Sequence, residues 1–282
     1  MIRADVLVEP VVLHGEGPTW DGAEQSLYWL DQLGGEVLTL DHGTVTRRPV
    51  GKVAAIIRPR VDAGHVVATE RSVLIVDKNW STLRQLPDLF DDPRVRLNDG
   101  GCDPQGRFYC GSMAYDEVTP LGTLYRIDAD GTSTVLLHDV TISNGLDWSP
   151  DGSTVYYVDS PTQGIDAFDF DPAAGAFANR RRIVTISPDV GTPDGLTVDN
   201  GGLLWVALWD GSAVHCYTPA GRLEDVVELP TRQVTACTFG GPQLDELFIT
   251  TSARDLEDDP LAGALFRAVP GVTGQPARKY RG

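Results

Sequence analysis

The sequence predicts an all-β protein, a six-bladed β-propeller built from four-stranded blades. Short runs rich in β-branched and aromatic residues recur along the 282 residues, each after a turn rich in Gly, Asp or Pro. One large apolar residue in each run recurs at intervals of 38, 42, 48, 48 and 43 residues, which is the period of propeller blades. Long helical periodicity is absent. The aligned residues are Trp29, Val67, Tyr109, Tyr157, Trp205 and Phe248.

Each repeating unit has the same order of elements. A first strand-like run is followed, after a break, by a second, and most units add a further run such as 132–137 or 224–229. The first runs cover residues 27–30, 65–68, 107–110, 154–158, 203–206 and 246–249. The second runs cover residues 36–40, 73–76, 123–127, 165–170, 213–217 and 264–269. Six such units predict six blades.

The two ends of the chain complete the predicted ring. Residues 4–8 form a good strand before the first unit, whereas residues 275–280 form a weak strand at best after the last unit. We therefore expect the N-terminal strand to complete the last blade, because this closure removes the open edges of the sheets. Residues 1–282 then form one propeller domain.

Composition excludes several classes of function. A hydrophobic fraction of 41% with 22% charged residues is typical of a soluble globular protein. A net charge of −17 argues against a nucleic-acid partner, because this surface would repel phosphates. The chain start lacks the apolar core of a signal peptide, and no run is long enough for a membrane helix. We expect a cytoplasmic protein with no membrane partner, and the sequence predicts no particular oligomeric state.

The four cysteines have no C-x-x-C spacing. In a chain without a disulfide-rich context, this pattern favours buried free thiols. A single bridge between Cys102 and Cys110 is the alternative, since these residues can lie on adjacent strands.

A candidate site emerges from the position that precedes each aligned apolar residue by 11 to 13 residues. The innermost strands of a propeller line the central channel, so equivalent residues converge near one end of its axis. Four units place a carboxylate or an amide there, and the other two windows hold residues 54–56 and 235–237. Asn-Gly and Asp-Gly pairs are also common in turns, but each unit has its hairpin turn several residues later. The four residues are Glu16, Asn98, Asn144 and Asp194.

These side chains offer only oxygen ligands. Such a set suits a hard divalent cation, with Ca²⁺ favoured and Mg²⁺ or Mn²⁺ also suitable, although Zn²⁺ or Fe²⁺ can occupy such sites. A bound metal polarises carbonyl groups and lowers the pKa of bound water, which points to hydrolysis. Arg96 shares a strand face with Asn98, so its guanidinium is expected to bind substrate oxygens, a surface arginine being the alternative. The five histidines have no metal-ligand spacing, and neither a G-x-S-x-G nor an H-E-x-x-H motif is present.

Several motifs together resemble the SMP-30/gluconolactonase/luciferin-regenerating (regucalcin-like) family. The matching segments begin at Gly15 (GEGPTW), Arg96 (RLNDGGCDPQGRFYCGSM), Gly122 (GTLY), Ser143 (SNGLDWSPDG) and Pro193 (PDGLTVD), and the similarity continues over residues 204–209. The resemblance implies a six-bladed propeller with one divalent metal near a channel mouth, and lactone hydrolysis as its activity. The metal used varies within the family among calcium, zinc, manganese and iron(II).

The resemblance also implies roles for single residues. Glu16, Asn144 and Asp194 match the metal ligands of the family, and Asp194 also matches its general base. Arg96 and Asn98 match substrate-binding residues, Asn98 also contacting metal-associated water or the metal itself in some members. Two further residues complete the expected site: Asp99, which lies beside these residues and supports them, and Asp116, which occupies the position of a substrate-contacting glutamate in some sugar lactonases.

The leading hypothesis is a metal-dependent hydrolase that opens a small sugar lactone such as a glucono- or xylonolactone. Loops 115–121 and 253–261 are expected to select the substrate. One alternative is a non-catalytic calcium-binding or interaction propeller, because a fold does not dictate a function. The other is an organophosphatase-like propeller hydrolase with two metals.

Overall fold

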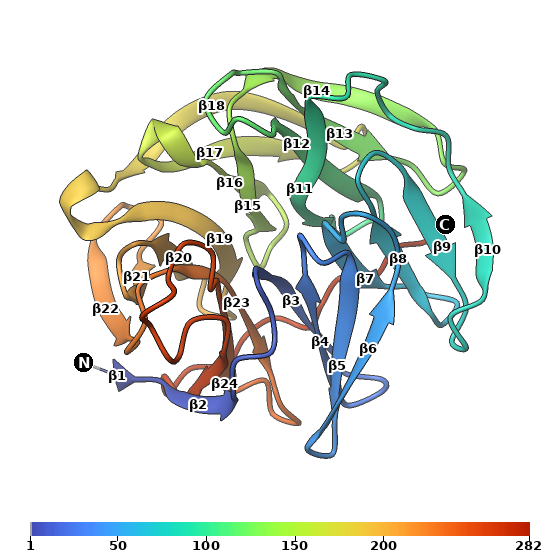
Figure 1. Ribbon diagram of the computed structural model, residues 1–282. Helices are drawn as coiled ribbons and strands as arrows, with labels where there is room; N and C mark the ends of the chain where they lie inside the picture. The colour runs from blue at the N-terminus through green and yellow to red at the C-terminus, as the bar shows by residue number, and fades with distance from the viewer. Residues whose placement is uncertain (1) are drawn as a thin grey trace.

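The computed structural model describes residues 2–282 and confirms a six-bladed β-propeller (Figure 1). Blade 1 contains β3 (Gly15–Asp21), β4 (Ser26–Asp31), β5 (Glu36–Asp41) and β6 (Thr44–Pro49). Blade 2 contains β7 (Ile56–Pro59), β8 (His65–Ala68), β9 (Val73–Val76) and β10 (Thr82–Gln85). Blade 3 contains β11 (Val95–Cys102), β12 (Phe108–Ala114), β13 (Gly122–Ile127) and β14 (Ser133–Val140).

The second half of the chain repeats this order. Blade 4 contains β15 (Ser143–Trp148), β16 (Thr154–Asp159), β17 (Gly164–Asp171) and β18 (Ala176–Thr185). Blade 5 contains β19 (Thr192–Val198), β20 (Leu204–Trp209), β21 (Ala213–Tyr217) and β22 (Leu223–Glu228). Blade 6 contains β23 (Val234–Gly240), β24 (Glu246–Thr251) and β25 (Leu265–Ala268) from the C-terminal part of the chain. Two 3₁₀ turns, η1 (Ser160–Thr162) and η2 (Pro188–Val190), are the helical segments of residues 2–282, and neither is long enough to cross a membrane.

The N-terminal strand closes the ring, as the sequence predicts. β2 (Asp5–Val8) pairs antiparallel with β25, with Asp5 opposite Arg267 and Val6 opposite Phe266. Blade 6 therefore combines both ends of the chain, and β2 lies beside the red C-terminal strands in Figure 1. A short strand, β1 (Ile2–Arg3), adds a parallel edge to β22 of blade 5, a pairing that the repeat pattern did not indicate.

The aligned apolar residues lie on the second strand of each blade and form the packing between blades. Trp29, Tyr109, Tyr157 and Trp205 are buried, and Tyr109 packs against Trp148 at 5.1 Å between ring centroids. All four cysteines are buried and free, which confirms the prediction of unpaired thiols. The spacing of the aligned residues thus follows the spacing of the blades.

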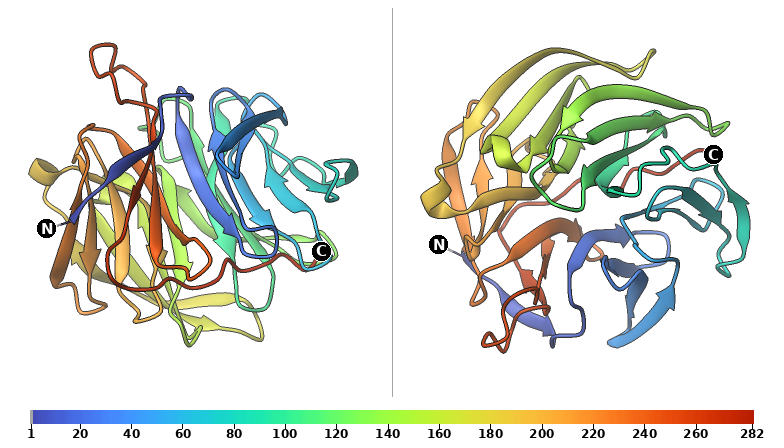
Figure 2. Two further views of the ribbon diagram at one scale, coloured as in Figure 1. Left: turned by 90° about the horizontal axis from the view of Figure 1, so that it is seen from below. Right: turned by 45° about the horizontal axis from the view of Figure 1, so that its top comes forward.

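The segment after β25 crosses the face of the ring at one end of the channel (Figure 2, left). Gln275 donates hydrogen bonds to the carbonyl oxygens of Trp148 and Val198, and Arg278 forms an ion pair with Asp147. Tyr280 is fully buried and bridges to Arg60. The sequence predicts little more than a weak strand here, but the segment ties blades 2, 4 and 5 together.

Candidate functional site

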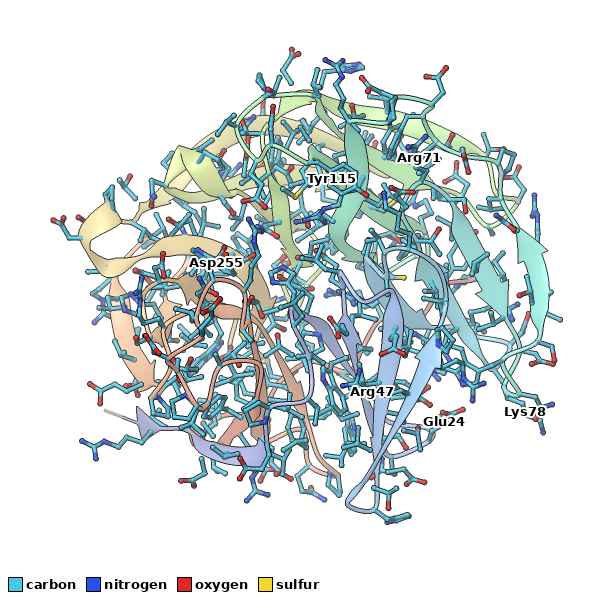
Figure 3. All side chains as sticks on the ribbon, in the orientation of Figure 1. Glu24, Arg47, Arg71, Lys78, Tyr115 and Asp255 are labelled. Atoms are coloured by element: carbon cyan, nitrogen blue, oxygen red, sulfur yellow. The ribbon has the colours of Figure 1, made fainter. Side chains whose placement is uncertain are left out.

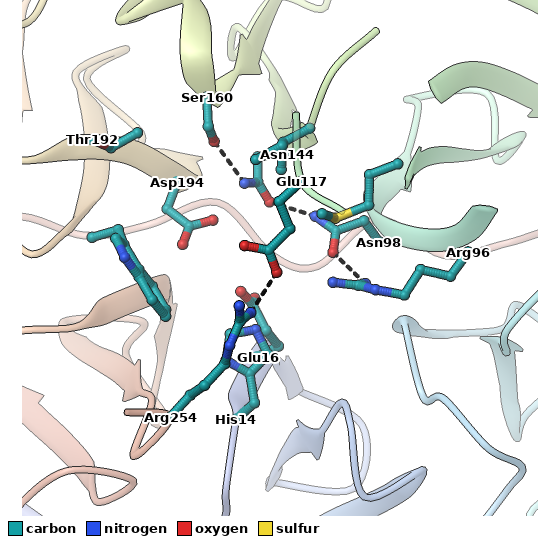
Figure 4. A pocket seen from close by; sticks show the side chains of 13 residues that line it. His14, Glu16, Arg96, Asn98, Glu117, Asn144, Ser160, Thr192, Asp194 and Arg254 are labelled. Atoms are coloured by element: carbon teal, nitrogen blue, oxygen red, sulfur yellow. Dashed lines mark hydrogen bonds and ion pairs between the residues drawn. The ribbon is translucent and has the colours of Figure 1, made fainter. Parts of the chain in front are cut away.

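Four oxygen-bearing side chains lie on four innermost strands and line one pocket of about 100 Å³ (Figure 4). Glu16 is on β3, Asn98 on β11, Asn144 on β15 and Asp194 on β19, and all are buried. Each lies in the first half of its strand. The C-terminal segment contacts Asp147 and the end of β15, so it covers the opposite end of the channel.

Each of these four side chains lies at an irregularity in strand pairing. The register between the first two strands of the blade shifts between Glu16 and Thr19, Leu97 and Gly100, Ser143 and Leu146, and Pro193 and Leu196. β7 and β8 of blade 2, which supply no such oxygen ligand, pair without a shift. A bulge turns side chains away from the regular alternation of a strand. The bulges therefore explain how polar groups can leave an otherwise apolar strand and face the channel.

The glycines that follow these residues allow the innermost strands to approach closely. A Cβ on Gly145 would lie 2.6 Å from the backbone nitrogen of Leu196, and a Cβ on Gly195 would lie 2.6 Å from the Cβ of Ala236. Both glycines are inside strands, so the Asn-Gly and Asp-Gly pairs are not hairpin turns. Their role is to leave space where strands converge on the axis.

A chain of hydrogen bonds fixes the two amides. The Arg96 guanidinium donates to Asn98 Oδ1 at 2.6 Å, and Asn98 Nδ2 donates to Asn144 Oδ1 at 2.9 Å. Asn144 Nδ2 in turn donates to Ser160 Oγ at 2.7 Å. Because Arg96 has only donors, it sets the orientation of Asn98, which sets that of Asn144. The oxygen of Asn144 is thereby held on the pocket side of the relay.

Burial and mutual repulsion dominate the electrostatics of the pocket carboxylates, and the charge of Arg96 offsets only part of these effects. Burial, followed by the charge of Asp99, raises the pKa of Glu16 to about 8. Burial also raises the pKa of Asp194 well above its usual range, and the charges of Glu16 and Asp99 add to the effect. Asp99 itself is buried, with a raised pKa, and its Oδ1 accepts a hydrogen bond from the amide of Gly100. Three mutually repelling carboxyl groups therefore lie around one end of the channel.

The donor set fits a cation. Asp194 Oδ1 is buried and has no hydrogen-bond partner within residues 2–282. A buried carboxylate oxygen is rarely left unpaired, because the loss of hydration is costly. A divalent cation would satisfy this oxygen and offset the repulsion among the carboxylates. Oxygen atoms of Glu16, Asn144 and Asp194 surround the space where such a cation would lie (Figure 4).

The structure does not bring Asp116 to the pocket. Asp116 is exposed in the loop between β12 and β13, where its carboxylate accepts hydrogen bonds from the amides of Val118 and Thr119. The adjacent Glu117 lines the pocket instead. Adjacent residues of a loop point in different directions, and the turn that Asp116 caps orients the longer glutamate inward. Asp99 lies on β11, next to Asn98, and its side chain does not line the pocket.

Two functional candidates come from loops that are far apart in the sequence. Glu117 and Arg254 form an ion pair across the pocket, from loops 115–121 and 252–264 (Figure 4). His14 also lines the pocket, with Nδ1 at 2.9 Å from Ser252 Oγ, and burial lowers its pKa to about 3, so it is neutral. The histidine has no sequence signal beyond its place two residues before Glu16.

Comparison with known proteins places the chain in a family. The model of the SMP-30/gluconolactonase/LRE-like region matches residues 14–253. The chain belongs to this family. A protein named putative sugar lactone lactonase YvrE, from Bacillus subtilis, is 34% identical over 90% of this chain and 90% of its own length. Pentonolactonase XacC of Haloferax volcanii is 34% identical over 93% and 92% of the two chains.

Solved structures agree with this membership. A structure described as the calcium-binding protein regucalcin from Agrobacterium tumefaciens has a TM-score of 0.94 and 27% identity to this chain. The superposition covers 99% of this chain and 98% of that one. The two chains therefore share the propeller fold, and every residue that lines the pocket except Arg254 lies within the residues that the family model matches.

Proposed function

We propose that the protein is a metal-dependent lactonase that opens a small sugar lactone by adding water. The observation that carries the proposal is that Glu16, Asn144 and Asp194 line one pocket, with a buried Asp194 oxygen that lacks a partner among residues 2–282. Two relatives named as lactonases, from Bacillus subtilis and Haloferax volcanii, support this assignment. The small volume of the pocket favours a small substrate.

Glu16, Asn144 and Asp194 would hold the metal. Their oxygen atoms favour Ca²⁺, and Mg²⁺, Mn²⁺, Zn²⁺ or Fe²⁺ are alternatives for the same set. When bound, the metal supplies Lewis acidity toward a carbonyl oxygen and toward water. Neutralisation of the pocket charge would lower the pKa values of Glu16 and Asp194 and keep both ionised at neutral pH.

The remaining residues bind and orient the lactone. Arg96 presents hydrogen-bond donors along one wall, where ring hydroxyl groups or the ring oxygen can accept them. Asn98 donates both of its amide hydrogens to Ser143 and Asn144, so its part is to orient the guanidinium through Oδ1. Met113, Ile142 and Trp209 form an apolar wall that limits water access. Fixed donors in a water-poor site stabilise developing charge better than water does. These residues therefore restrict the pose of the lactone carbonyl relative to Asp194.

Asp194 is placed to move the proton. In the proposed reaction, water adds to the lactone carbonyl carbon and one of its protons passes to Asp194. The ring C–O bond then breaks, and the alkoxide that leaves takes this proton from Asp194 to give the open-chain hydroxy acid and restore the carboxylate. A cation would hold Asp194 Oδ1, so the proton would be carried on the other carboxylate oxygen.

The decisive experiment compares Asp194→Asn with the wild type on gluconolactone and xylonolactone. Acid release is followed by pH-stat with the spontaneous rate subtracted, and the variant should lose at least ~100-fold in kcat/KM. Chelation of the metal should give a similar loss that is reversed by adding metal back. Asp62→Asn serves as the matched control, because this carboxylate is exposed and outside the pocket. Turnover by Asp194→Asn at the wild-type rate would contradict the proposal.

The two alternatives give different results in the same experiment. A calcium-binding propeller without activity would show metal-dependent thermal stabilisation and no turnover of any lactone. An organophosphatase-like hydrolase would hydrolyse phosphotriesters and bind two metals at the channel. One metal at the channel together with lactone turnover supports the lactonase.

A further inference from the structure

A second group of possible metal ligands lies at the other end of blade 1, away from the channel pocket. Asp21 is the last residue of β3, Glu24 follows in the turn before β4, and His65 is the first residue of β8 in blade 2. One ligand atom from each residue lies within 4.8 Å of the other two. Figure 3 shows Glu24 at the outer part of the ring, well away from Tyr115 and Asp255, which belong to the loops at the pocket.

The His65 side chain is buried without a polar partner. It is 1% exposed, and neither ring nitrogen has a hydrogen-bond partner among residues 2–282. Trp80 stacks on one side of the ring at 5.2 Å, and Tyr28 lies at 4.5 Å. Buried imidazole groups are normally hydrogen-bonded. An unpaired nitrogen that faces two carboxylates is instead typical of a metal ligand.

The carboxylate of Asp21 is oriented toward this histidine. Its Oδ1 accepts hydrogen bonds from the amides of Ala23 and Glu24, at 2.8 and 3.4 Å. Its Oδ2 faces His65 Nε2 at a distance of 3.8 Å, which is too long for a direct hydrogen bond. The turn between β3 and β4 thus holds one oxygen and directs the other toward the imidazole, as the supporting contacts of metal-binding carboxylates do.

Glu24 completes the group from an exposed position. Its Oε2 accepts a hydrogen bond from the Tyr28 hydroxyl, so one oxygen is oriented while the side chain keeps freedom to move. Ligands of one tetrahedral Zn²⁺ ion lie roughly 3.4 Å apart, given bond lengths of about 2.0–2.2 Å. Asp21 Oδ2 and His65 Nε2, at 3.8 Å, are already near that spacing. A movement of about 1.5 Å by the exposed Glu24 side chain would bring its oxygen from at most 4.8 Å to that spacing.

The charge at this position favours a divalent cation. Neither nitrogen of the buried His65 ring has a hydrogen-bond partner among residues 2–282, so a ring nitrogen is available as a ligand. The carboxylates of Asp21 and Glu24 face it, and the nearby Lys279 carries a single positive charge. Glu24 is exposed, so the group is open to solvent on the side of this glutamate. The site therefore has a ligand set, an excess of negative charge and access from solvent.

We propose that Asp21, Glu24 and His65 form a second metal site that takes a borderline transition cation such as Zn²⁺. The histidine nitrogen distinguishes this site from the oxygen-only channel site, since imidazole suits Zn²⁺, Cu²⁺ or Ni²⁺ better than Ca²⁺. The three ligands come from β3, the β3–β4 turn and β8. A bound ion would therefore connect blade 1 to blade 2 at a position far from the lactone pocket. Water would complete its coordination.

The test measures the zinc bound by a variant that lacks the proposed channel metal site. Glu16→Gln combined with Asp194→Asn removes the two carboxylate ligands proposed for the channel metal, and this double variant should retain one Zn²⁺ per chain by elemental analysis after dialysis. Adding Glu24→Gln should weaken zinc binding at least tenfold in a titration. Glu9→Gln, a change at another exposed glutamate, should leave zinc binding unaltered.

A spectroscopic readout identifies the ligand directly. Co²⁺ bound to the double variant should give visible absorption bands, and its paramagnetism should broaden the ring signals of His65, which His65→Asn removes. His65→Asn can affect folding because the side chain is buried, whereas Glu24→Gln changes an exposed residue and keeps the test valid. Absence of zinc from the double variant, or equal zinc affinity in the Glu24→Gln and Glu9→Gln forms, would overturn the proposal. Lactone turnover has no part in these measurements, so failure here is separate from failure of the proposed function.

Discussion

Replacing Glu16 by glutamine is expected to stabilise the metal-free protein and to remove its stabilisation by metal. The side chain is buried at the channel, and its carboxylate is repelled by Asp99 and Asp194. Glutamine has a similar shape and can still accept the hydrogen bond from the Gly17 amide, but it carries no charge. The substitution therefore measures how much the Glu16 carboxylate destabilises the folded protein while the packing of the side chain is kept.

The magnitude follows from the pKa of Glu16. Burial, followed by the charge of Asp99, raises this pKa from 4.5 to about 8. Because the pKa is higher in the folded state, the folded protein keeps a proton that the unfolded chain releases, and stability falls as the pH rises from 4.5 toward 8. At pH 7 about 2.5 pH units of this range have passed, at about 1.36 kcal/mol each, so the cost is about 3 kcal/mol.

The assay is thermal unfolding followed by circular dichroism in a chelator and in saturating Ca²⁺. Without metal at pH 7, Glu16→Gln should raise Tm by roughly 5–10 °C, and the difference should shrink toward pH 4.5. With metal, the wild type should gain stability and the variant should not. Glu9→Gln is the control for the loss of an exposed charge. A metal-free Glu16→Gln protein that unfolds at or below the wild-type temperature at pH 7 would refute this reasoning.

Three further substitutions test the close approach of the inner strands, the loop ion pair at the pocket and the C-terminal segment. Gly145→Ala places a Cβ 2.6 Å from a backbone nitrogen of β19 and should lower the urea midpoint, whereas Gly22→Ala, with no atom within 4 Å, should leave the midpoint unchanged. Arg254→Ala removes the ion pair with Glu117 and should raise KM for the lactone more than it lowers kcat in steady-state kinetics. Tyr280→Ala deletes a fully buried ring from the C-terminal segment and should cost about 3–5 kcal/mol in equilibrium unfolding, and a loss below about 1 kcal/mol would contradict the bracing role of that segment.

The repeat pattern in the sequence predicted most of the fold and the four residues at the centre of the candidate site. Each blade repeats one order of turns and strands, so the period of Trp29, Tyr109, Tyr157 and Trp205 gave the blade number directly. The same period placed polar residues at equivalent positions of innermost strands. Ring geometry then brings those positions together whatever the details of the loops.

The repeat pattern could not predict contacts between loops, because the loops do not follow the period of the blades. Glu117 and Arg254 are 137 residues apart and meet only because the ring places their loops on the same side of the pocket. Their conformations depend on local turns, and the turn capped by Asp116 directs the neighbouring glutamate inward. The resemblance to the family predicted Asp116 as a substrate contact from its position in the sequence. The conformation of the loop instead places the neighbouring Glu117 at the pocket.

The sequence by itself determined a closed six-bladed ring and four oxygen-bearing side chains at equivalent places in its innermost strands. Tertiary structure alone decided that bulges turn those side chains into the channel, that the C-terminal segment covers the other end, and that His65 of blade 2 faces Asp21 of blade 1. The physical reason is that periodicity describes contacts within a repeat. Contacts between repeats depend on the closure of the whole ring.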